Sequence, residues 1–236
     1  MPRCRPAARP TTSRTSRTRA KECPGGGSSA PRPTPPHGHA RGRLAVSAAE
    51  VHAALQGWAA RLASLGAAVV PRLRPGLTYR EAATLAARHG YELDEDVAAL
   101  WTWRDGTTPG LPAAHLAPGQ EFAPLDASLR RSREYHEASL AEARGDRRTW
   151  QAHWVVAVHG HALPLVLDGS RPGPDTFRHD PHAHPLHVAR STLAQRVARW
   201  HEMVDTGTWR VARDGTWDVD LTHLPAVPHA HRQDLT

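Results

Sequence analysis

The sequence has no isoleucine and no asparagine, and a single lysine, Lys21, stands beside 29 arginines. Lysine, isoleucine and asparagine share AT-rich codons, so their scarcity indicates a GC-rich coding sequence. Codon bias can then account for the arginine excess without selection for phosphate binding. Both cysteines, Cys4 and Cys23, lie close to the N-terminus. No disulfide framework can therefore hold the rest of the chain, which suits a reducing cytosol.

Long apolar runs are also missing from the sequence. No stretch approaches the roughly 18 apolar residues of a membrane-spanning helix. The arginine-rich N-terminus has no apolar segment of the kind that a signal peptide needs. We therefore expect a soluble, cytoplasmic protein that has no membrane partner.

The charge of the chain is divided unevenly. A formal net charge of +7 and a pI near 10.5 would ordinarily favour nucleic acid or an anionic membrane as a partner. Residues 1–43, however, carry nine Arg, one Lys and one Glu, a net charge of +9. The remaining 193 residues carry 20 basic and 22 acidic side chains, a net charge of −2. The basic character therefore belongs to an N-terminal tail.

This tail, residues 1–43, lacks Leu, Val, Phe, Trp and Tyr and contains eight Pro and five Gly. It cannot bury enough apolar surface to offset the loss of chain entropy, and we expect it to be disordered. Three interpretations remain open: upstream sequence read from a wrongly assigned start codon, an unstructured linker, or an arginine-dependent nucleic-acid tether. The tail lacks the interleaved aromatic residues that stack on bases, so we favour the first two and expect no nucleic-acid partner.

Residues 44–236 have the periodicity of one folded domain, which begins with helices. Ser47 and Glu50 form a capping box, and apolar residues then recur every three or four positions. This pattern predicts a long amphipathic helix that ends near Pro71. The apolar positions are Val51, Leu55, Trp58, Leu62, Leu65 and Val69.

Three further helices are expected before the β-rich part of the chain. Thr78 caps a helix that stops at Gly90, and Asp94 caps another that stops at Gly106. A polar helix follows from Asp126 to about residue 143. Residues 107–125 contain four prolines and predict a loop around a short strand near Phe122.

Two pairs of apolar segments flank short turns and predict two β-hairpins: residues 154–158 with 162–167, and residues 209–212 with 217–219. The dipeptide Asp214-Gly215 favours a type I′ turn in the second hairpin. We also expect a strand at residues 186–189 and a helix capped by Ser191. This order of helices and hairpins predicts an α+β fold with a mainly antiparallel sheet and flanking helices.

Three motifs stand in order between residues 50 and 207. The first is a Leu-Arg-Pro turn and a helix that ends in "WTWRDG", the second is a strand–turn–strand segment that ends in Leu-Asp, and the third is a Ser-capped helix followed by Gly; they cover residues 73–107, 150–168 and 188–207. In this order the motifs resemble those of the SUKH superfamily, which includes bacterial toxin-immunity proteins and fungal cell-wall-assembly regulators. Residues 44–236 are therefore identified as a SUKH-like domain.

The resemblance implies a protein that binds another protein. Immunity members of the family neutralise a co-encoded toxin by direct contact, are not enzymes and need no cofactor. We accordingly expect a non-enzymatic binding module whose partner is a toxin domain. The resemblance does not place the binding face, because a family likeness constrains the fold more closely than the function.

Histidines form the clearest pattern outside the resemblance, with the spacing H-x-x-H-x-H-x-x-H at His179, His182, His184 and His187. Neutral imidazoles are good zinc ligands, and His159 and His161 of the hairpin could lie near. With Asp175 or Asp180 as general base, a His-ligated metal-dependent hydrolase is the alternative hypothesis. Pro174, Pro181 and Pro185 stand in and just before this segment, which predicts a loop that does not pre-organise ligands. We therefore expect no functional metal site.

Other catalytic patterns are missing from residues 44–236, which have no cysteine, no G-x-S-x-G and no glycine-rich phosphate loop. We accordingly assign no catalytic residue. Trp103 follows Trp101 by two positions on its helix and so points in another direction. It could be an exposed anchor for a partner, although packing against a neighbouring element is the interpretation we favour.

Overall fold

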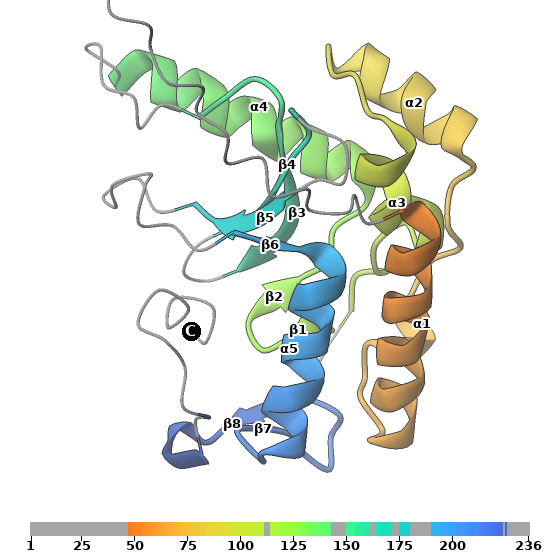
Figure 1. Ribbon diagram of the computed structural model, residues 1–236, viewed down its shortest axis with the longest axis vertical. Coiled ribbons are helices and arrows are strands. Elements are labelled where there is room, and N and C mark those ends of the chain that lie inside the picture. The colour runs from red at the N-terminus through yellow and green to blue at the C-terminus, as the bar shows by residue number, and fades with distance from the viewer. Residues whose placement is uncertain are drawn as a thin grey trace, which may run out of the picture. The chain divides into compact units, whose positions relative to one another are not determined.

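The computed structural model describes residues 47–110, 114–142, 150–160, 164–170, 175–179, 190–223 and 225. The expected disordered tail, the expected strand at residues 186–189 and three of the four spaced histidines lie outside these residues. Within them the chain forms five α-helices (Figure 1): α1 (Ala48–Ser64), α2 (Tyr79–Arg88), α3 (Glu95–Trp103), α4 (Leu125–Glu142) and α5 (Leu193–Asp205). Two short 3-10 helices, η1 (Val70–Arg72) and η3 (Leu221–His223), complete the helical part.

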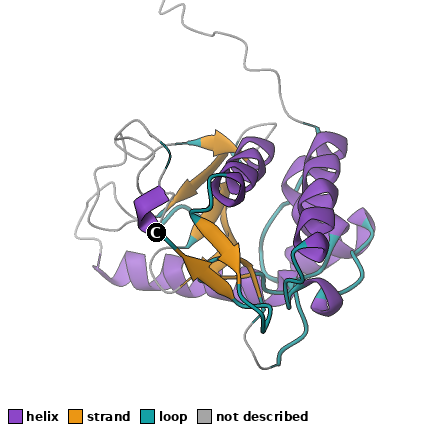
Figure 2. Ribbon diagram, turned by 90° about the horizontal axis from the view of Figure 1, so that it is seen from below, coloured by secondary structure: helices purple, strands orange, loops and turns teal. Residues whose placement is uncertain are grey.

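The strands that the structure describes form an antiparallel sheet and a separate hairpin. The sheet follows the chain order β1 (His115–Ala117), β2 (Gln120–Glu121), β3 (Trp154–Gly160), β4 (Leu165–Asp168), β5 (Asp175–Arg178) and β6 (Ser191–Thr192). The hairpin pairs β7 (Trp209–Val211) with β8 (Trp217–Val219). Figure 2 shows the strands at the centre, with helices to the right of them, above them and below them. The predicted α+β fold is confirmed.

Local capping signals position the helices. The predicted capping boxes at Ser47 and Thr78 are both formed, and Asp94 caps α3 by accepting a hydrogen bond from Val97 N. Helix α1 nevertheless ends at Ser64, well before Pro71. Gly66 takes a left-handed φ of 75°, which turns the chain out of the helix.

The main core lies between the helices and one face of the sheet. Trp58 of α1 is fully buried at its centre, where its indole Nε1 donates to Leu116 O at 3.0 Å. The Trp58 ring also stacks on that of Trp217 with 6.1 Å between centroids. Leu165 and Leu167 of β4 close this core from the sheet side. The buried Trp58 ring and the hydrogen bond of its indole N–H hold α1 against the sheet and against the second hairpin.

Strand β5 lies in a segment for which the sequence predicted a loop. It pairs in register with β4, from Asp168 opposite Asp175 to Leu165 opposite Arg178. Residues 171–174 before the strand hold two prolines and a glycine, and Pro181 follows it, so the local composition favours a loop. The strand forms because it pairs with β4.

Helix α5 begins one residue later than predicted. Ser191 belongs to β6, where it pairs with Thr176 of β5. Thr192 is the N-cap, and its hydroxyl accepts from Gln195 N while the Gln195 side chain accepts from Thr192 N. Both residues pair with β5, and Thr192 is the one whose hydroxyl reaches Gln195 N, at 3.2 Å.

The second hairpin is confirmed, but the predicted type I′ turn is wrong. That turn needs positive φ at both central residues, whereas Gly215 alone has one, at 80°. Gly215 N donates to Ala212 O at 2.9 Å and Ala212 N to Thr216 O at 2.8 Å. The loop is therefore a type I turn followed by a left-handed glycine.

Candidate functional site

The second face of the sheet carries a cluster of aromatic rings. Side chains alternate between the two faces of a strand, so Val155 of β3 points into the main core while Trp154 and Val156 point the other way. Around them gather rings from α4, from the residues before β3 and from β5. We call this the aromatic face; its rings are Tyr135, Trp150, Trp154, His159, Phe177 and His179.

The rings of the aromatic face contact one another in series. Tyr135 stacks on Trp150 with 4.8 Å between ring centroids, and Trp150 meets Trp154 edge to face at 5.8 Å. Trp154 in turn meets Phe177 edge to face at 4.9 Å. Trp150 and Phe177 are buried, whereas Tyr135 and Trp154 are half-buried. The cluster is thus a rigid apolar base with two aromatic side chains that remain partly accessible.

Helix α4 is joined to this region through a buried serine. The Ser132 hydroxyl donates to Ser128 O at 2.7 Å and accepts from Val156 N of β3 at 2.9 Å. The strand register shifts between Val156 and Val158, which is a β-bulge. The bulge and the serine together hold α4 beside β3, and so they hold Tyr135 against Trp150.

Asp168 forms the polar end of the aromatic face. Its carboxylate is 7% exposed and accepts from Arg190 Nη1 at 2.6 Å, and His153 Nε2 lies 3.2 Å away. Ser170 donates to it through both its backbone N and its hydroxyl, at 3.1 and 2.7 Å. Burial by itself would raise the pKa of Asp168, but the bonds from Ser170 and Arg190 outweigh it and lower that pKa.

Arg190 connects the polar end to the rings. While one nitrogen bonds Asp168, the guanidinium carbon lies 4.8 Å from the centroid of Phe177, which is a cation–π contact. Its side chain is 38% exposed, and that of His153 is 45% exposed. The aromatic face therefore ends in a positioned arginine that a partner can reach.

The Ser170, His153 and Asp168 side chains do not have the order of a catalytic triad. In a triad the histidine stands between the serine and the carboxylate and removes the serine proton. Here the Ser170 hydroxyl donates directly to Asp168, two residues earlier, and the backbone of Ser170 bonds the same carboxylate oxygen. This is the geometry of an Asx turn. The carboxylate orients Arg190 and His153 and leaves no base on the serine.

The structure places Trp103 in the core. It is 5% exposed, its ring stacks on Phe122 with 6.2 Å between centroids, and its indole Nε1 lies 3.4 Å from Gln56 Oε1. Packing against neighbouring elements, the favoured interpretation, is confirmed. The alternative of an exposed anchor is wrong, because Phe122 and Gln56 pack against the Trp103 ring.

His179 is the only member of the spaced histidines among the described residues. Its ring meets Trp150 at 4.9 Å and Trp154 at 5.6 Å, as part of the aromatic face. His182, His184 and His187 lie outside the residues that the structure describes, as do His161 and Asp180. In the part of the chain that is described, no three metal-ligating side chains come together.

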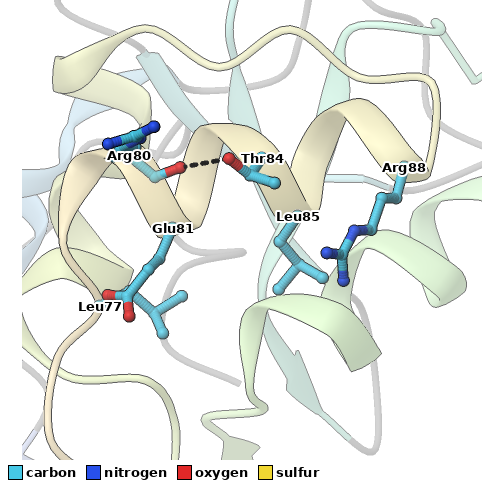
Figure 3. A pocket seen from close by; sticks show the side chains of 6 residues that line it. All are labelled: Leu77, Arg80, Glu81, Thr84, Leu85 and Arg88. Carbon is cyan, nitrogen blue, oxygen red and sulfur yellow. Dashed lines mark hydrogen bonds between the residues drawn. The ribbon is translucent and has the colours of Figure 1, made fainter.

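A separate hollow of about 360 Å³ lies along α2. Figure 3 shows the described residues that line it: Leu77, Arg80, Glu81, Thr84, Leu85 and Arg88. The hollow is a different site from the aromatic face, because none of its lining residues belongs to the sheet.

Comparison with models of known protein families finds no match, and comparison with curated proteins finds none at a significant level. None of the described helices is long and apolar enough to cross a membrane. A functional assignment therefore depends on the residues of this chain and on the motifs that resemble the SUKH superfamily.

Proposed function

We propose that the chain is a non-enzymatic, cytoplasmic protein-binding module of the SUKH type, which neutralises a toxin domain by direct contact. The aromatic face carries this proposal. Half-buried Trp154 and Tyr135 rest on a rigid base, with Arg190 held beside them. Tryptophan, tyrosine and arginine are the residues that contribute most to binding energy at protein interfaces.

The physical reason is preorganisation. A side chain already fixed by packing loses little conformational entropy when a partner covers it. Trp154 is fixed by contacts with Trp150 and Phe177, and Arg190 is fixed by Asp168 and Phe177. A stable complex buries about 800 Å² on each partner, so other side chains around this face would complete the interface.

Binding of the full chain to the toxin domain encoded beside its gene tests the proposal. Calorimetry should give a one-to-one complex, and Arg190→Ala should weaken it at least about tenfold because an interface arginine is lost. Arg210→Ala is the matched control, since Arg210 also pairs with an aspartate, Asp220, but belongs to the second hairpin. No complex with the wild-type chain would refute the function; equal effects of both substitutions would refute the assignment of the face.

A further inference from the structure

The hollow along α2 combines an apolar floor with two cations. Leu77 and Leu85 pack against the main core with one side and remain half-buried on the other. Arg80 and Arg88 lie toward the two ends of the hollow, with Thr84 between them donating to Arg80 O at 2.7 Å (Figure 3). The helix itself is held by contacts with α3 and α4, so the floor is a fixed surface.

Neither arginine has an anionic partner within the described part of the chain. Both side chains are exposed. Other arginines pair with aspartate or glutamate, as Arg61 does with Asp205. Glu81 lies between them, but its carboxylate accepts from Thr78 N at 2.7 Å and from Thr78 Oγ1 at 2.8 Å in the capping box. These bonds lower the pKa of Glu81 and turn its charge toward the N-terminus of the helix.

Other titratable groups lie near the end of α2 that carries Arg88. His89 follows Arg88 directly and bonds Asp126 Oδ1 at 2.9 Å. Its pKa is nevertheless lowered, first by burial and then by the positive charges of Arg133 and Arg130 on α4. Arg130 and Arg133 pair with Asp126 and Glu137 of the same helix, so Arg88 is the cation at this end with which an incoming carboxylate would pair.

We propose that this hollow binds an acidic segment of a protein that carries an apolar side chain between two carboxylates. The apolar side chain would cover Leu77 and Leu85, and the carboxylates would pair with Arg80 and Arg88. Eight residues of helix separate the arginines by about 12 Å, so they take two carboxylates rather than one small anion. The volume of about 360 Å³ suits one or two side chains.

A protein segment fits the hollow better than nucleic acid does. A phosphate backbone would bury no apolar surface on the leucines. Leu77 and Leu85 also offer no aromatic ring on which a base could stack. The site is separate from the aromatic face and does not depend on the function proposed above.

Titration of the isotope-labelled full chain with a synthetic helical peptide tests this site. The peptide carries a central pair of leucines between glutamates that are about two turns apart. We expect its binding to shift the backbone amide signals of α2, and Arg80→Ala with Arg88→Ala to weaken binding about tenfold. Arg213→Ala is the matched control, because Arg213 is equally exposed but belongs to the second hairpin.

Two comparison probes make the test decisive. A peptide with lysines in place of the glutamates, and a single-stranded DNA oligonucleotide, should leave the α2 signals unchanged. The proposal is overturned if the acidic peptide does not shift the α2 signals, or if the oligonucleotide shifts them as strongly as the peptide does. It is also overturned if Arg213→Ala weakens peptide binding as much as the double variant does. None of these results bears on the toxin complex, which is measured separately.

Discussion

Asp168 is the residue on which the polar end of the aromatic face depends. It is nearly buried and receives hydrogen bonds from Ser170 and Arg190, with His153 beside it. A buried carboxylate is tolerated only where such partners replace water. Removing its charge would therefore affect both the stability of the domain and the position of Arg190.

We predict that Asp168→Asn lowers the free energy of unfolding at neutral pH by about 1–3 kcal/mol, measured by urea denaturation. The folded-state pKa of Asp168 lies below its unfolded value. The stabilisation by this carboxylate is therefore complete above the unfolded pKa of about 3.9 and is lost as the pH falls through the folded pKa. The difference between wild type and variant should shrink in that acidic range.

Asp214 provides the control for this prediction. It makes the same kind of turn, accepting from Thr216 N at 3.0 Å and Thr216 Oγ1 at 2.6 Å. Asp214 is exposed, however, and none of the described arginines pairs with it. Asp214→Asn should change stability much less than Asp168→Asn. Equal losses would mean that the turn, rather than the contact with Arg190, accounts for the role of Asp168.

Two glycines should respond to substitution in opposite directions. A Cβ at Gly76 would lie 2.0 Å from Thr102 O, so Gly76→Ala should cost about 1–3 kcal/mol or more. A Cβ at Gly57, inside α1, would meet nothing within 4 Å, so Gly57→Ala should stabilise by about 0.5–1 kcal/mol. Thermal unfolding of both variants measures the two effects, and a stable Gly76→Ala protein would contradict the close approach of the chain to α3.

At the scale of elements, α5 tests which hydroxyl residue caps the helix. Thr192→Ala removes the acceptor of Gln195 N and should cost about 1 kcal/mol. Ser191→Ala loses only a 3.3 Å contact between hydroxyls and should cost about 0.5 kcal/mol or less. Urea denaturation distinguishes the two. A larger loss for Ser191→Ala would restore the cap that the sequence predicted.

Elements with local signals could be predicted from the sequence. The capping boxes of α1 and α2, the Asp94 cap of α3 and the first hairpin depend on residues a few positions apart. Strand β5 could not be found in this way, because its formation depends on pairing with β4 rather than on its own composition.

The aromatic face could not be predicted either. Tyr135, Trp150 and Phe177 come from α4, from the segment before β3 and from β5, and they meet only when the sheet has formed. The run of apolar residues in β3 hides its two faces, since Trp154 and Val155 are equally apolar yet point in opposite directions. For Trp103, the interpretation that we favoured from the sequence, packing against a neighbouring element, is the one that the structure shows.

For the whole molecule, the division of charge is the feature that separates protein binding from nucleic-acid binding. We predict that residues 44–236, with a net charge of −2, show no salt-dependent binding to DNA. Any such binding by the full chain should be lost when residues 1–43, which carry +9, are deleted. Fluorescence anisotropy across a range of salt concentrations measures both, and DNA binding by the shortened chain would contradict a protein-binding domain.

The two proposed binding regions would give the whole molecule two different kinds of surface. The aromatic face combines rings with one arginine, and the hollow on α2 combines leucines with two arginines. They share no lining residue, so we expect substitutions in one to leave binding at the other unchanged.

The central claim, neutralisation of a toxin by direct contact, is tested most directly by growth rescue. The C-terminal domain of a secreted protein encoded beside this chain's gene is expressed in a sensitive host, with and without the full chain. The account predicts that cells survive only when the full chain is present and that Arg190→Ala reduces the rescue. Continued killing in the presence of folded, soluble full chain, or the absence of any such neighbouring gene, would contradict it.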